Sequence, residues 1–137
     1  MEIKVEVTRV EKPRGTVEWL KAELEEGNIR LTESNNHYIP AYDPHNGGEQ
    51  IQTHSLVIYE PGECGLKENE AVICWKNFYG EYETNIDAAL GVDEHSHWAL
   101  GLDKEAKQAL TTICEQWVKL VTDRGEPETP TIDVTIN

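Results

Sequence analysis

The chain has 137 residues, a size at which one domain buries enough surface to fold without disulfides or a structural metal. Its 26 acidic and 12 basic residues give a formal net charge of −14, which repels nucleic acid and anionic membranes and attracts cationic partners. Because no cluster of Lys and Arg is present, direct binding of nucleic acid is not expected. Four tryptophans and five tyrosines distinguish the chain from disordered acidic sequences, which are usually poor in aromatic residues.

The cysteines and the hydropathy pattern indicate the cellular compartment. Three cysteines without CxxC spacing argue against both a disulfide framework and a zinc ribbon. Cys74 and Cys114 lie in apolar runs and are expected to be buried. The N-terminus lacks the pattern of a signal peptide, and no apolar stretch approaches the ~20 residues that span a bilayer. We therefore expect one cytoplasmic domain over residues 1–137, with no membrane association and no cofactor.

The N-terminal part of the chain predicts a strand followed by a short helix. Residues 2–10 alternate between apolar and polar side chains, as in a half-buried strand. Thr16 is a good cap for a helix over 17–26, and Gly27 is placed to end it. The competing interpretation is a hairpin that turns at 27–28, because apolar residues alternate again directly after it. The apolar stripe favours the helix.

The middle of the chain predicts a long loop and an antiparallel strand pair. Residues 32–50 are rich in Asn, Asp, Gly and Pro and are expected to form a long irregular loop. Strands are expected over 50–60 and 71–78, where apolar and β-branched residues gather. A single helical turn is expected over 86–90.

The clearest predicted element is an amphipathic helix over about 103–123. Asp103 caps it, apolar residues recur at helical spacing, and Gly125 follows it as a stop signal. A last strand is expected over 131–136. Together these patterns predict an α+β fold: an antiparallel sheet of four to five strands with the long C-terminal helix packed on one face.

Two histidines suggest one chemical hypothesis. In an extended segment His95 and His97 project to the same side, and two imidazoles can share one metal ion. The alternative function is therefore a metal-dependent hydrolase or a small-molecule-binding domain that uses this pair. An HxH spacing alone is common, however, and a metal site needs three or four ligands, so no metal site is assigned.

Nucleophilic catalysis has less support. Cys64 lies in a glycine-rich turn where a thiol is accessible, but its acidic neighbours disfavour a thiolate. The adjacent pairs 54–55 and 96–97 each join a serine to a histidine, and neighbours on a strand point to opposite faces. No GxSxG, P-loop, GxGxxG or HExxH motif occurs. We therefore do not expect an enzyme.

Charge distribution is more informative than any motif. Residues 31–66 contain no Lys or Arg, and neither do residues 77–103. Together the two stretches are expected to form one continuous acidic surface. Aromatic residues such as Tyr79 lie within the second stretch and suit the anchors that protein interfaces favour. The acidic residues of the two stretches are Glu33, Asp43, Glu49, Glu60, Glu63, Glu81, Glu83, Asp87, Asp93, Glu94 and Asp103.

The leading hypothesis is a non-enzymatic binding protein whose acidic surface blocks a basic, nucleic-acid-handling protein partner. Small acidic domains of this size are common among phage anti-defence inhibitors and among immunity proteins for bacterial toxins, which is an association from size and charge. Assembly into a homo-oligomer is a third hypothesis. The residues expected to contact the partner are Glu81, Tyr82, Glu83, Asp87, Asp93, Glu94 and Trp98.

Overall fold

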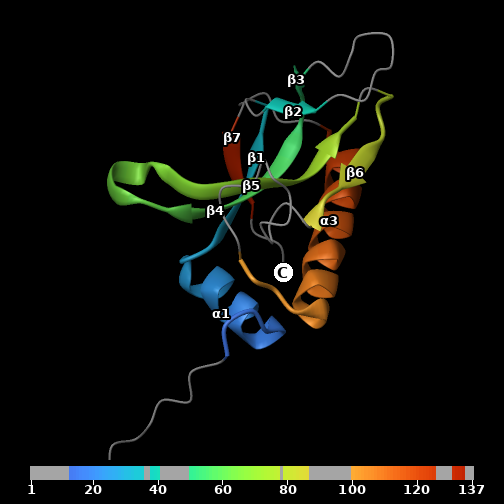
Figure 1. Ribbon diagram of the computed structural model, residues 1–137. Helices are drawn as coiled ribbons and strands as arrows, with labels where there is room; N and C mark the ends of the chain where they lie inside the picture. Colours follow the sequence, from blue (N-terminus) through green and yellow to red (C-terminus); the bar gives the residue numbers. More distant parts are fainter. Residues whose placement is uncertain are drawn as a thin grey trace, which may run out of the picture.

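The computed structural model describes residues 13–35, 38–40, 50–77, 79–86, 100–125 and 131–134 (Figure 1). Within these residues an antiparallel sheet has the strand order β6-β5-β4-β1-β7, and a second sheet pairs β2 with β3. The helices are α1 (Val17–Glu26), the short 3-10 helix η1 (Glu63–Gly65) and α3 (Lys104–Arg124). The strands are β1 (Arg30–Ser34), β2 (Tyr38–Pro40), β3 (Gln50–Gln52), β4 (Ser55–Pro61), β5 (Lys67–Lys76), β6 (Tyr82–Thr84) and β7 (Thr131–Val134).

The predicted α+β architecture is confirmed. The larger sheet has five strands, all adjacent pairs within it are antiparallel, and α3 runs along it beside β6 (Figure 1). Helix α1 contacts α3. Among the residues that the structure describes, no helix is both long enough and apolar enough to cross a membrane.

Local sequence signals account for both long helices. The Thr16 side chain accepts a hydrogen bond from the Trp19 backbone N–H at 3.2 Å, and Gly27 ends α1 in the left-handed conformation with φ of 80°. The helix interpretation of 17–26 is therefore correct, and the hairpin alternative is wrong. At the start of α3 the Asp103 carboxylate accepts from the Ala106 backbone N–H at 2.8 Å.

The hydrophobic core lies between α3 and one face of the five-stranded sheet. Successive residues of a strand point to opposite faces of the sheet, so alternate residues of β1, β4 and β5 point toward the helix, apart from the register shifts between β4 and β5. The strands contribute Leu31, Leu56, Ile58, Ala71, Ile73 and Cys74 to this core, and Ile29 joins it directly before β1. Helix α3 contributes Ala106, Leu110, Cys114, Trp117 and Val121, which recur every three or four residues.

Three expectations need correction. Residues 32–34 belong to β1, which lies between β4 and β7, and 38–40 form β2, so the segment 32–50 is not one irregular loop. The expected strand 50–60 is divided into β3 and β4, which belong to different sheets. Strand β5 begins at Lys67, four residues earlier than expected.

Other expected elements lie wholly or partly outside the described residues. The strand over 2–10 is one of these, and of the helical turn over 86–90 only Ile86 is described. The last strand is described from Thr131 to Val134, where it pairs with β1.

A close backbone contact joins the start of α1 to the start of α3. Gly15 has φ of +90°, and its carbonyl accepts a hydrogen bond from the Asp103 backbone N–H at 2.8 Å. A Cβ at Gly15 would lie 2.3 Å from the carbonyl oxygen of Gly101. The segments that precede the two helices therefore pack too closely for any side chain at this position.

We expect Gly15→Ala to destabilise the fold more than Gly27→Ala, measured as free energy of unfolding in urea. Both glycines flank α1 with φ near +80° to +90°, but a Cβ at Gly27 meets only the Arg30 side chain at 3.5 Å. Gly27→Ala should cost about 1 kcal/mol for the positive φ, and Gly15→Ala about 1–3 kcal/mol more for overpacking. Equal losses would show that the contact with Gly101 is not tight.

Candidate functional site

The structure describes only part of the predicted partner-binding set. Glu81 and Glu83 are exposed at β6, and Tyr82 between them is half-buried. Its ring turns inward, and its hydroxyl lies 3.0 Å from Nδ1 of His54. The remaining four residues of the set, Asp87, Asp93, Glu94 and Trp98, lie outside the described residues. So does the histidine pair of the alternative function, His95 and His97.

The first acidic stretch, residues 31–66, divides between the interior and the surface. Glu33 was expected on the acidic surface, but its exposed fraction is 0%, so this assignment is wrong. Glu63 is exposed and Glu60 is half-exposed, both in the β4–β5 hairpin. Asp43 and Glu49 lie outside the described residues. Among its described residues, the stretch therefore supplies an acidic surface at the end of this hairpin.

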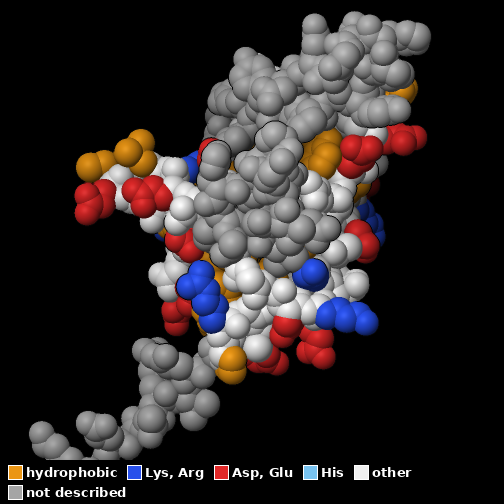
Figure 2. Space-filling view, in the orientation of Figure 1, with side chains coloured by type: hydrophobic (Ala, Val, Ile, Leu, Met, Phe, Trp, Pro, Cys, Tyr) orange, Lys and Arg blue, Asp and Glu red, His pale blue; other side chains and the backbone are white. Residues whose placement is uncertain are grey.

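The β4–β5 hairpin extends away from the helices, and acidic and hydrophobic side chains gather at its end (Figures 1 and 2). Leu66 is 66% exposed there, between the exposed side chains of Glu63 and Glu68. The ammonium group of Lys67 lies 5.0 Å from the centre of the Tyr59 ring, where it makes a cation–π contact.

The turn between β5 and β6 has a similar composition. Tyr79 is 66% exposed, and its backbone N–H and that of Glu81 both donate to the Asn77 side chain at 2.9 Å. This turn lies at the opposite end of β5 from the β4–β5 turn, about 30 Å away for a strand of this length. The described parts of the two acidic stretches therefore form two separate surfaces, and the expected single continuous surface is not found among the described residues.

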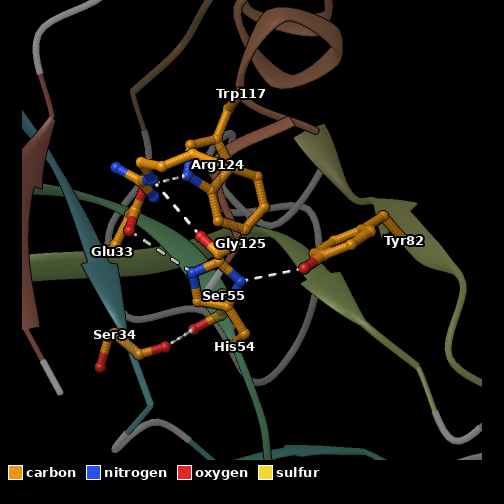
Figure 3. A network of polar contacts seen from close by, with 8 residues as sticks. All are labelled: Glu33, Ser34, His54, Ser55, Tyr82, Trp117, Arg124 and Gly125. Atoms are coloured by element: carbon orange, nitrogen blue, oxygen red, sulfur yellow. Dashed lines mark hydrogen bonds and ion pairs between the residues drawn. The ribbon is translucent and has the colours of Figure 1, made fainter. Parts of the chain in front are cut away.

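Beneath the sheet lies a buried polar cluster that consists of Glu33, His54, Tyr82, Trp117 and Arg124 (Figure 3). Oε1 of Glu33 accepts hydrogen bonds from Nε1 of Trp117 at 2.9 Å and from the Arg124 guanidinium at 2.5 Å. Arg124 is 42% exposed, so its charge is shared with solvent, whereas the carboxylate is completely enclosed. A carboxylate at this depth requires such partners, because an unpaired buried charge costs several kcal/mol.

His54 connects this carboxylate to β6. Nδ1 lies 3.0 Å from the Tyr82 hydroxyl, and Nε2 lies 3.5 Å from Oε2 of Glu33. The imidazole packs against the Trp117 indole at 4.9 Å between ring centres, and the Tyr82 ring meets the same indole edge-on at 5.4 Å. The side chains thus run from β6, through the residue that precedes β4, to β1 in the order phenol, imidazole, carboxylate.

Two facing atoms of the cluster remain without a hydrogen-bond partner. They are Nε2 of His54 and Oε2 of Glu33, and Oδ1 of Asn35 is a third such buried atom among the described residues. The serine beside His54 takes no part, because Ser55 donates to the Ser34 carbonyl at 3.2 Å.

The sequence contained one weak signal for this cluster. Apolar residues at 29 and 31 alternate, and continuing that period would have placed Glu33 on the core face. The turn-forming run Ser34-Asn35-Asn36 instead favoured a loop. Its partners, Trp117 and Arg124, are 84 and 91 residues away in the sequence, which local patterns do not connect.

A thiol pair lies in the core between β5 and α3. The hydrogen bond from Cys114 lowers the pKa of Cys74, helped by the Thr84 hydroxyl at 3.8 Å and opposed by burial. The same hydrogen bond, and then burial, raise the pKa of Cys114. Both thiols are completely buried and Cys64 is exposed, so the expected burial of Cys74 and Cys114 is confirmed.

No protein-family model, curated protein or solved structure matches the chain. Within the part of the chain that the structure describes, no group of three or more His, Cys, Asp and Glu side chains is arranged to hold a metal ion.

We expect Trp117→Phe to lower the free energy of unfolding by about 2–3 kcal/mol. The substitution keeps an aromatic ring against His54 but removes the N–H that donates to a buried carboxylate. Urea denaturation followed by circular dichroism measures the change. Trp19→Phe on α1, where the indole is half-buried, is the matched control and should cost less than half as much. Equal losses would mean that the Trp117 hydrogen bond contributes little.

The folded protein should present one reactive thiol to Ellman's reagent, and the protein unfolded in guanidinium three. Cys64 is exposed, whereas Cys74 and Cys114 are buried. Cys64→Ser should remove the fast reaction. Rapid modification of two or three thiols in the folded protein would contradict the packing of β5 against α3.

Proposed function

We propose that this chain is a non-enzymatic acidic binding protein that blocks a basic partner protein, of the kind that handles nucleic acid. Phage anti-defence inhibitors and toxin-immunity proteins are the types that its size and charge suggest. Carboxylates on such a protein occupy the Lys and Arg groups that the partner otherwise offers to phosphates.

One observation carries the proposal: each end of β5 combines a large exposed hydrophobic side chain with exposed glutamates. Leu66 lies among glutamates at one end, and Tyr79 lies beside Glu81 at the other. Interfaces use apolar or aromatic side chains as anchors and surrounding charges to steer association. Among the described residues, Leu120 on α3 is the one other large hydrophobic side chain that is exposed.

The two surfaces differ in how they are attached to the rest of the fold. The β5–β6 turn is joined to the core through Tyr82, whose hydroxyl lies next to His54. Tyr82 therefore holds β6 in place, while the exposed Tyr79 and Glu83 face outward. The β4–β5 hairpin extends beyond the helices, and a projecting hairpin can enter a concave basic site on a partner (Figure 1). The β5–β6 surface is the main contact in our proposal, and the hairpin end is a second one.

Affinity capture at low and high salt, with the native chain and charge-reversed variants as bait, tests the proposal. Glu81→Lys with Glu83→Lys should abolish recovery of the partner, and Glu63→Lys with Glu68→Lys should weaken it. Binding by the native chain should fall markedly as salt rises, because exposed charges are screened. Circular dichroism should show unchanged folding in every variant.

The matched control is Glu25→Lys with Glu115→Lys, which changes the net charge equally on exposed positions of α1 and α3. This control should recover the same partner as the native chain. If the control and the reversed variants recover identical proteins in equal amounts, the acidic ends of β5 do not bind a partner and the proposal fails.

A further inference from the structure

The facing atoms of Glu33 and His54 have the spacing of two metal ligands. Nε2 of His54 and Oε2 of Glu33 lie 3.5 Å apart, and neither has a hydrogen-bond partner. A charge-assisted hydrogen bond between such groups is shorter, about 2.7–2.9 Å. Two ligands of a tetrahedral ion with bonds of about 2.1 Å lie roughly 3.4 Å apart. The observed separation therefore fits shared coordination of an ion better than a shared proton.

Each of these two side chains is also oriented by a neighbour on its far side. Nδ1 of His54 lies 3.0 Å from the Tyr82 hydroxyl, and when Nδ1 carries the proton it donates to that oxygen and leaves the Nε2 lone pair facing Glu33. Oε1 of Glu33 is held by Trp117 and Arg124. Metal-binding histidines and carboxylates characteristically have such second partners, which fix the ligand and leave the other atom for the metal.

A third buried oxygen without a hydrogen-bond partner lies directly after β1. Asn35 follows Glu33 by two residues, and its Oδ1 is buried without a hydrogen-bond partner. Strand β1 pairs with β4 so that Ser34 faces Ser55. Asn35 and His54 are the residues directly beyond this last pair of the ladder. An imidazole nitrogen, a carboxylate oxygen and an amide oxygen form a donor set for a first-row divalent ion, with water completing the coordination.

We propose that Glu33, Asn35 and His54 form a binding site for a first-row divalent metal ion. This site is distinct from the acidic surfaces of the proposed function and does not depend on them. The Arg124 charge on Oε1 opposes a second cation nearby, so the site binds more weakly than one made of free carboxylates. A bound ion would connect β1 to β4 at the core face of the sheet and stabilise the fold.

Titration of the chelator-treated, untagged protein with Zn²⁺ alone, followed by calorimetry, tests the site. We expect one Zn²⁺ per chain and a higher melting temperature with Zn²⁺. His54→Gln and Glu33→Gln should each lose at least tenfold in affinity. Tyr82→Phe removes only the partner of Nδ1 and should lose about tenfold. This variant remains informative if the ligand substitutions prevent folding.

His95→Gln with His97→Gln is the matched control, because it removes the histidine pair of the sequence and leaves the proposed ligands intact. This control should bind Zn²⁺ as the native chain does. Co²⁺ should in addition quench tryptophan fluorescence in the native chain and in the control, because the Trp117 ring lies 4.9 Å from His54. The absence of Zn²⁺ binding, or binding that survives in Tyr82→Phe and is lost in the control, would overturn the proposal.

Discussion

The structure depends most on the enclosure of one carboxylate, Glu33, within the hydrophobic core. It lies in the row that begins with Ile29 and Leu31, where a third apolar residue would be expected. Trp117 and Arg124 from α3 meet its Oε1, so the register of the helix against the sheet is tied to this one oxygen. Buried charges are costly unless paired, and misplacing α3 would leave the carboxylate without its donors. The cluster therefore favours a single arrangement of helix and sheet.

The same cluster determines which of two neighbouring tyrosine side chains lies at the surface. Tyr82 turns inward, where its hydroxyl meets His54 and its ring meets Trp117. The neighbouring glutamates of β6 then point to solvent, since side chains alternate along a strand. At the β5–β6 turn Tyr79 is exposed instead. Tyr82 thus holds the edge of the sheet from the interior, whereas Tyr79 lies at the surface.

Much of the fold could be predicted from the sequence, because local rules governed those elements. Thr16 and Gly27 cap the two ends of α1, and Asp103 caps the start of α3. Each cap acts through hydrogen bonds to residues a few positions away. The candidate site could be predicted much less well. Strand β1 was mistaken for a loop because the partners that make Glu33 acceptable in a core are far away in the sequence. Exposure of Glu81 and Glu83 agrees with the acidic pattern, but Tyr82 faces the interior.

By itself the sequence determined the class of fold, the two helices, the burial of Cys74 and Cys114, and the excess of negative charge. These follow from periodicity, capping and composition, which act over short distances or over the whole chain. Only the tertiary structure decided that Glu33 is internal and that the exposed acidic residues among the described parts of the two stretches appear at opposite ends of β5. Both outcomes depend on strand pairing and on contacts across the sheet, which join residues that no local pattern connects.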